Sequence, residues 1–113
     1  MDKKLLIRVD TLLRHINEVL NDLQNISFDE FEKSSLLQRA TSFSISQIGE
    51  IMIKLQESLE EKYPDLPWKD ARRMRNFIVH DYVNIEIEDV YKTAKNDLPI
   101  LKTAFEQIRE NLK

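Results

Sequence analysis

An apolar side chain recurs every three or four residues along most of the chain, and this repeat constrains the fold more than any other sequence feature. It has the 3.6-residue period of an α-helix that buries one face. Over the first 23 residues the repeat consists of Leu5, Val9, Leu12, Ile16, Val19 and Leu23. A single glycine and three prolines in 113 residues leave few residues suited to the tight turns of a β protein. The sequence therefore predicts an all-α protein.

Polar residues predict where the first helices end and restart. The first helix is expected to end near Asn25. Ser27, followed three residues later by Glu30, has the spacing of a capping box and predicts a short helix over residues 28–33. At Ser34 and Ser35 the chain is then expected either to bend or to form a new cap before a long helix.

Two prolines separate this long helix from the next one. The long helix is predicted to run to about Lys62, because Pro64 and Pro67 break the pattern after it. Pro67 suits the first turn of a new helix, which should end near His80. We expect Trp68 to anchor this helix to the rest of the protein.

The last helix is predicted from about Glu86 to Leu112. Pro99 lies inside it and should kink it without ending it, because the apolar repeat keeps its phase on both sides. Four principal helices with short links predict an up-and-down four-helix bundle with one short additional helix. Residues 1–113 are expected to form a single domain.

Composition limits the compartment and the chemistry. The absence of cysteine removes disulfides, thiolate nucleophiles and zinc–thiolate sites, which suits a reducing cytoplasm. The first five residues lack the apolar core of a secretory signal peptide. No apolar run approaches the ~20 residues of a membrane span. We therefore expect a cytoplasmic protein with no membrane segment, no metal site and no cofactor.

A cluster of positive charge stands out from an acidic chain. The net charge is −3, so the surface as a whole does not attract nucleic acid. Between residues 69 and 75, however, the only acid is Asp70. The cations of this segment are Lys69, Arg72, Arg73 and Arg75. They predict a local patch able to bind RNA phosphates.

An arginine and a histidine stand five residues apart beside this patch, at Arg75 and His80, with Tyr82 two residues further on. A neutral imidazole can take a proton from a ribose 2′-hydroxyl, and its protonated form can give one to the departing 5′-oxygen. Arg75 offers a fork of donors to the phosphate oxygens. These residue types favour metal-independent RNA cleavage. The other histidine, His15, is expected to be a surface or packing residue.

The spacing of this pair creates a geometric question. Residues five apart differ by about 140° around a regular helix, so Arg75 and His80 do not point side by side. Convergence requires Arg75 to reach around the helix, the helix end to be distorted, or a second copy of the motif to lie across a dimer axis. Arg72, Asn76 and His80 form a polar row on the face opposite the apolar residues.

Several further motifs accompany the pair in order along essentially the whole chain. They are Ser27–Phe31 (SFDEF), Gln47–Glu50 (QIGE), Tyr63–Trp68 (YPDLPW), Met74–Asn76 (MRN), His80–Tyr82 (HDY) and Asn96–Pro99 (NDLP). Through them the chain resembles the HepT-like proteins of the HEPN superfamily. Ala71, Arg72 and Arg73 depart from the small-residue turn with glycine that many relatives have, which bears only on local helix geometry.

The resemblance implies a toxin ribonuclease of a toxin–antitoxin pair. HepT-like proteins form homodimers in which two such Arg/His motifs line one cleft. The implied partner is a MntA-like minimal nucleotidyltransferase antitoxin, which can transfer AMP from ATP onto the tyrosine that follows the histidine. By this resemblance Arg75 and His80 are catalytic, Asn76 is supporting, and Tyr82 is the modification site. Added bulk and negative charge there would block RNA.

The same residues also have structural interpretations. Arg75 can pair with a carboxylate such as Glu50 or Asp81, and Tyr82 can be an aromatic plug at one end of the bundle. Gly49 can let two helices approach closely. The neighbouring cations can form an ordinary solvated surface.

Two other function classes follow from these interpretations. One is a non-catalytic helical module that binds the substrate of a nucleotidyltransferase or presents Tyr82 to it. The other is a purely structural dimerisation bundle, against which the outward polar row counts. The intact Arg75–His80 pair favours the nuclease.

Overall fold

The computed structural model describes residues 2–113. Its helices are α1 (Lys3–Asp22), α2 (Phe28–Glu32), α3 (Ser35–Leu59), α4 (Trp68–Asp81), α5 (Ile87–Lys92) and α6 (Leu98–Leu112). A 3-10 turn over Tyr82–Asn84 follows α4, and a π-helical turn over Thr93–Asp97 joins α5 to α6. No β-strand occurs within residues 2–113, and the all-α prediction is confirmed.

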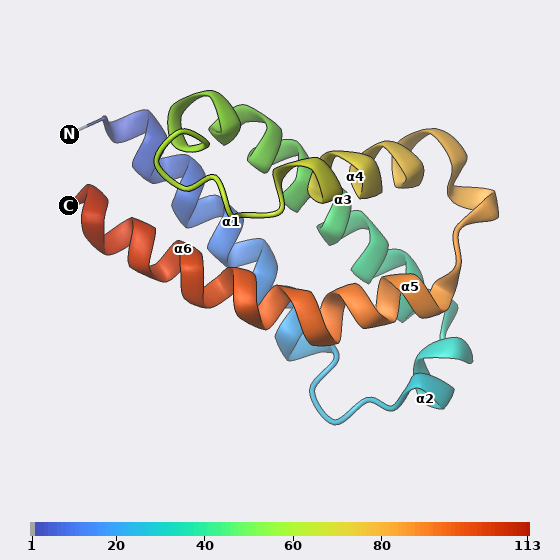
Figure 1. The fold of residues 1–113 in the computed structure, drawn as a ribbon. Helices are drawn as coiled ribbons and strands as arrows, with labels where there is room; N and C mark the ends of the chain where they lie inside the picture. The colour runs from blue at the N-terminus through green and yellow to red at the C-terminus, as the bar shows by residue number, and fades with distance from the viewer. Residues whose placement is uncertain (1) are drawn as a thin grey trace.

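The helices form the predicted up-and-down bundle with a short extra helix. Figure 1 shows α5 and α6 as one long bent rod, with α1 beside α6. α3 packs against both α1 and α4. The short α2 lies at the far end of the bundle, where it contacts α3 and α5.

The caps at the first helix boundaries are those the sequence predicts. Asn25 adopts a left-handed backbone conformation with φ 61°, which turns the chain after α1. The Ser27 hydroxyl accepts from the Glu30 N–H at 3.1 Å, and the Glu30 carboxylate accepts from the Ser27 N–H at 3.1 Å. Ser34 caps α3 by accepting from the Leu37 N–H at 3.1 Å. The predicted capping box is confirmed, and of the two outcomes expected at Ser34 and Ser35 the structure shows a new cap.

The link between α3 and α4 differs slightly from the prediction. α3 ends at Leu59 rather than near Lys62. The residue directly before a proline avoids the helical region, so Tyr63 cannot continue the helix into Pro64, and the chain leaves the helix in a turn over residues 60–62. Pro67 lies immediately before α4 rather than in its first turn, and its carbonyl accepts from the Ala71 N–H at 3.0 Å.

Pro99 bends the last rod without ending it, as predicted. Its ring lacks an N–H and would clash with the carbonyl of Lys95 in a regular helix. The π-helical turn just before it widens the backbone and accommodates the ring. The Lys95 ammonium also donates to the Leu23 carbonyl at 2.6 Å, which ties this turn to the end of α1.

The core lies between α1, α3 and the α5–α6 rod. Its fully buried side chains include Val9, Leu12, Ile16, Val19, Phe31, Leu55, Val90 and Phe105. α4 contributes only Trp68 as a buried residue and packs mainly on α3. Most of the α4 surface therefore remains available for other contacts.

Gly49 marks the closest approach of α3 and α4, as its motif suggested. A Cβ atom at this position would lie 2.6 Å from the Arg75 Cβ and 2.8 Å from the Ala71 carbonyl oxygen. Both atoms belong to α4, one of them to its backbone, so they cannot yield without a shift of the helix. Only glycine fits here.

We expect Gly49→Ala to lower the free energy of unfolding by about 1 kcal/mol or more, as measured by urea denaturation. The overpacking should exceed the ~1 kcal/mol that alanine gains over glycine in helix propensity. Ser58→Ala, at an exposed position of the same helix, should change it by less than about 0.5 kcal/mol. A Gly49→Ala protein as stable as the wild type would contradict the tight approach.

Candidate functional site

Trp68 fastens the first turn of α4 to the bundle. The side chain is 4% exposed, and its ring packs edge-on against Phe105 with centroids 6.4 Å apart. The indole N–H donates to the Tyr63 carbonyl at 2.9 Å, so its polar atom is satisfied. The predicted anchor is confirmed, and it sets the direction in which α4 extends.

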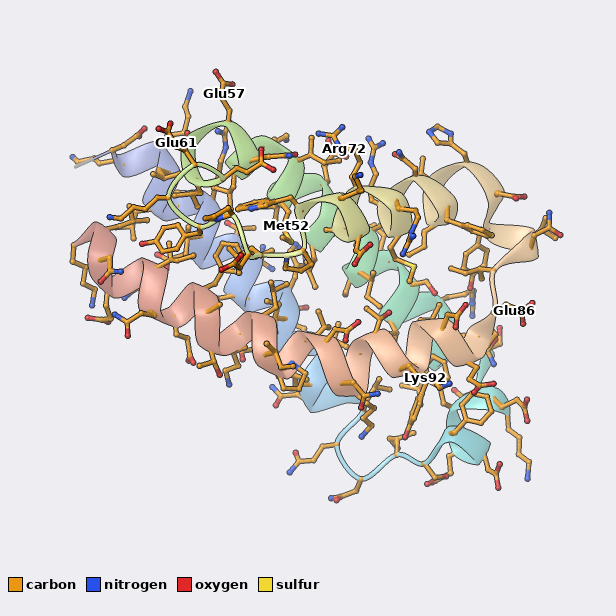
Figure 2. All side chains as sticks on the ribbon, in the orientation of Figure 1. Met52, Glu57, Glu61, Arg72, Glu86 and Lys92 are labelled. Atoms are coloured by element: carbon orange, nitrogen blue, oxygen red, sulfur yellow. The ribbon has the colours of Figure 1, made fainter. Side chains whose placement is uncertain are left out.

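One exposed face of α4 gathers most of the predicted site residues. At 100° per residue these five side chains fall within an arc of about 100°. They are Lys69, Arg72, Arg73, Asn76 and His80, and all five are exposed. We call this surface the cationic face of α4. In Figure 2, Arg72 projects from the side of α4 away from the α5–α6 rod.

Two of these cations have partners that leave them accessible. Arg72 donates to Gln56 of α3 at 3.2 Å, and Arg73 pairs with Asp70 at 3.1 Å. The Arg73–Asp70 pair is solvent-exposed and such pairs contribute little stability, so both arginines can turn toward a phosphate at small cost.

Arg75 lies at the edge of the cationic face and is held on two sides. Its Nε and Nη2 donate to one carboxylate oxygen of Glu50 at 2.8 and 2.7 Å. Its Nη1 donates to Asn76 Oδ1 at 2.6 Å. Of the two carboxylates suggested by the sequence, Glu50 is therefore the partner, whereas Asp81 accepts from Asn84. The Arg75 side chain remains 27% exposed and can reach a ligand.

Arg75 and His80 do not converge within one chain. α4 stays a regular helix through Asp81, so no distortion closes the angle of about 140° between them. The Arg75 side chain is directed toward α3 by Glu50 rather than around α4 toward His80. Two of the three proposed routes to convergence are thus absent from this structure, and the third, a second copy across a dimer axis, involves more than a single chain.

An apolar strip runs beside the Arg75–Glu50 pair. The contacts Arg72–Gln56 and Arg75–Glu50 show that α3 and α4 are antiparallel, because residue numbers rise along α4 in the direction in which they fall along α3. Phe43 and Leu36 lie seven and fourteen residues before Glu50 on the same side of α3, and Val79 follows Arg75 by one turn. The strip Leu36, Phe43 and Val79 is 69%, 61% and 54% exposed, respectively.

Tyr82 lies where α4 gives way to the 3-10 turn. Its side chain is 37% exposed, so it is not a buried plug in the isolated chain. The turn is closed by the Ile85 N–H, which donates to the Tyr82 carbonyl at 3.0 Å, and by the Asn84–Asp81 hydrogen bond at 2.8 Å. Tyr82 therefore stands on an ordered turn two residues from His80.

The comparison with known proteins assigns the family. The profile of the family described as Ribonuclease HepT-like matches residues 12–108. The chain belongs to the HepT-like ribonuclease family. A Methanocaldococcus jannaschii relative, named a putative RNase, is 29% identical to this HepT-like chain over 101 residues, which cover 89% of the chain and 84% of the relative. A Thermococcus cleftensis relative, named a probable ribonuclease HepT, is 30% identical over 87 residues, 77% of the chain and 79% of the relative.

The sequence predicted the candidate site residues on α4 of the HepT-like chain but not their neighbours on α3. Gln56, the partner of Arg72, was not predicted, because it lies sixteen residues away along the chain and has no local signal. Glu50 was predicted only as one of two alternatives. Both contacts depend on how closely α3 and α4 pack at Gly49.

The other histidine of the HepT-like chain, His15, lies on α1 with 14% of its side chain exposed. This burial, followed by the charge of Arg14, lowers the pKa of His15 below the ordinary value of 6.5. Within residues 2–113 no group of three or more His, Asp or Glu side chains could hold a metal ion. None of the helices described is both long and apolar enough to cross a membrane.

A hollow of about 620 Å³ lies between α3, α4 and the α5–α6 rod of the HepT-like chain. Its apolar lining includes Ile48, Met52, Met74, Phe77 and Leu98. The charged residues around it are Asp70, Glu86, Asp89, Asp97, Arg73 and Lys92. Acids outnumber cations there, so the hollow attracts anions less than the cationic face of α4 does.

Proposed function

We propose that this HepT-like chain is a metal-independent endoribonuclease in which His80 moves protons and Arg75 stabilises the scissile phosphate. The observation that carries the proposal is the cationic face of α4, which exposes His80 beside three cations and Asn76 while Arg75 borders it. Family membership and the names of the relatives support ribonuclease activity.

The proposed reaction is an internal transfer at phosphorus. His80 removes the proton of a ribose 2′-hydroxyl, and the 2′-oxygen attacks the adjacent phosphorus. The bond to the 5′-oxygen of the next nucleotide breaks, and a protonated imidazole gives that oxygen its proton. The products are a 2′,3′-cyclic phosphate end and a 5′-hydroxyl end. Arg75 meets the charge that builds on the non-bridging oxygens.

The active unit in this proposal is a homodimer. A single chain supplies one exposed imidazole, whereas the reaction needs one base and one acid. The apolar strip of Leu36, Phe43 and Val79 supports a second copy, because it is exposed and adjoins the Arg75–Glu50 pair. Pairing of two such strips would bring two cationic faces to one cleft.

We further propose that the chain is the toxin of a toxin–antitoxin pair with a MntA-like nucleotidyltransferase, which inactivates it at Tyr82. The phenol oxygen would attack the α-phosphorus of ATP, pyrophosphate would leave, and the phenol proton would pass to solvent. Exposure of Tyr82 on an ordered turn beside His80 supports this role. An added phosphodiester would repel RNA from the cationic face.

The test of the nuclease is cleavage of total RNA by the purified protein in the presence of EDTA. The wild type should cleave and His80→Ala should not, with mass spectrometry confirming that Tyr82 carries no modification in either sample. No cleavage by a folded, unmodified dimer would contradict the proposal.

The cationic face predicts a salt dependence. Changing Lys69, Arg72 and Arg73 to Gln, one at a time, should reduce the slope of log affinity against log salt by about 0.7 each for single-stranded RNA. Fluorescence anisotropy with a 2′-O-methyl oligonucleotide measures this slope without cleavage. Lys102→Gln on α6 is the control, and an equal change in that variant would show that only net charge matters.

For Tyr82 we expect Tyr82→Phe to remain toxic when the nucleotidyltransferase and ATP are present, because the acceptor oxygen is missing. Mass spectrometry should find AMP on the wild type and none on the variant. Tyr63→Phe, a tyrosine on the link before α4, should still be modified and neutralised. Neutralisation of Tyr82→Phe by a catalytically active partner, accompanied by AMP addition elsewhere, would refute this assignment.

The second candidate function is a non-catalytic helical module of a nucleotidyltransferase. The observation that favours it is that the Arg75–Glu50 ion pair is complete within one chain, as in a purely structural contact. Such a module would bind its partner and present Tyr82 but would leave RNA intact. Wild-type cleavage that depends on His80 separates the two functions.

A further inference from the structure

We infer that Glu50 is a positioning residue for RNA cleavage. It aims the Arg75 guanidinium at the scissile phosphate and limits how tightly Arg75 holds RNA before reaction. The inference rests on the proposed ribonuclease function and deepens it, because it assigns a role to a carboxylate that would otherwise oppose phosphate binding.

The hydrogen bonds of Arg75 leave a defined set of free donors. A guanidinium has five N–H groups. Glu50 occupies the edge formed by Nε and Nη2, at 2.8 and 2.7 Å, and Asn76 takes one donor of Nη1 at 2.6 Å. Two donors therefore remain, one on each terminal nitrogen. These donors are free to bond to the oxygens of a phosphate.

The stem of Arg75 is confined as well. Because position 49 is glycine, the backbone of α3 lies directly against this stem, and a single added carbon would be 2.6 Å from the Arg75 Cβ and 3.4 Å from its Cγ. The next residue, Glu50, holds the guanidinium at the other end. Two consecutive residues of α3 thus restrain both ends of one side chain of α4.

Glu50 is suited to this role by its position and its limited exposure. Its side chain is 34% exposed and that of Arg75 is 27% exposed, so the pair is partly shielded from water. Asp81, the other acid suggested by the sequence, bonds to Asn84. The carboxylate that orients Arg75 is therefore supplied by α3 rather than by the helix that carries the motif.

The two effects of Glu50 act in opposite directions. Its negative charge offsets Arg75 and weakens the attraction of the free site for RNA. Its two hydrogen bonds keep the remaining donors aligned with the transition state, and a loss of such alignment slows chemistry. Removal of the charge should therefore improve binding while it slows cleavage. An ion pair that merely stabilises the fold predicts no such split.

The experiment compares wild type, Glu50→Gln, Glu50→Asp and Glu57→Gln, with His80→Ala as the inactive reference. The single-turnover cleavage rate is measured at saturating protein on an RNA oligonucleotide, and the dissociation constant on its 2′-O-methyl counterpart. Glu57 is an exposed residue seven positions further along α3, so Glu57→Gln makes the same charge change outside the site (Figure 2). Thermal unfolding checks each fold.

Glu50→Gln should cleave about 10–100-fold more slowly than wild type, with RNA affinity equal or tighter. Glu57→Gln should cleave at the wild-type rate. Glu50→Asp keeps the charge but is one methylene shorter, so its affinity should stay unchanged while its rate falls. If Glu50→Gln does not fold, the rate and affinity of Glu50→Asp test the inference.

A wild-type rate in a folded Glu50 variant, or a parallel loss of rate and affinity, overturns the inference. The proposed nuclease function still holds in that case, provided that the wild type cleaves RNA and His80→Ala does not. If the wild type and His80→Ala behave alike, the proposed function itself has failed.

Discussion

Replacement of His80 by alanine is expected to slow RNA cleavage about 10²–10⁴-fold, the usual contribution of a positioned acid or base. The fold should not change, because the side chain is exposed and lies in the last turn of α4. Cleavage of a defined oligonucleotide, followed by thermal unfolding of the same sample, measures both quantities. His15→Ala is the matched control, since it removes the other histidine, on α1.

Arg75→Ala should lower the rate by about 10²–10³-fold through loss of phosphate stabilisation. It also leaves Glu50 without its partner, so its thermal unfolding should be followed separately. Persistent toxicity in a cell that expresses either the His80 or the Arg75 variant would rule out the mechanism. Loss of cleavage in the His15 variant, with its fold intact, would show that the assay does not report on the α4 site.

Replacing Leu36 and Phe43 together by serine is expected to separate the homodimer and to abolish cleavage. Both side chains are exposed in the single chain and lie on α3 beside the Glu50–Arg75 pair. Loss of two large apolar contacts at an interface typically costs several kcal/mol, enough to raise the dissociation constant by about a thousandfold. Analytical ultracentrifugation measures the mass, and the oligonucleotide assay measures activity. Ile100→Ser, at a 72% exposed position of α6, should change neither.

Mixing the wild type with an excess of His80→Ala tests whether the cleft is shared. Because one copy supplies the base and the other the acid, a mixed dimer contains a single His80 imidazole and should cleave as slowly as the variant alone. At a threefold excess of His80→Ala, random exchange pairs only one wild-type chain in four with another wild-type chain, so activity per wild-type chain should fall to about a quarter. Undiminished activity per wild-type chain would show that each copy cleaves RNA on its own.

The bundle was predictable because its signals are local. The spacing of apolar residues that gives each helix one buried face can be read from short stretches of sequence, and so can the caps at Ser27 and Ser34. Pro99 was correctly predicted to bend the last helix. The π-helical turn that accommodates it was not, since widening of the backbone depends on what the next turns pack against.

The sequence by itself determined which residues of this protein could take part in chemistry. His80, its neighbouring cations and Asn76 belong to α4, and Tyr82 directly follows it. Residue type and the helical period suffice to place these side chains on an exposed surface. Only the tertiary structure decided the state of Arg75. Its partner Glu50 lies 25 residues earlier, and the two meet because Gly49 lets α3 and α4 approach to backbone contact. The ion pair with Glu50 turns the Arg75 side chain away from His80. No local sequence pattern encodes this orientation, because it depends on the distance between two helices rather than on the order of residues within either helix.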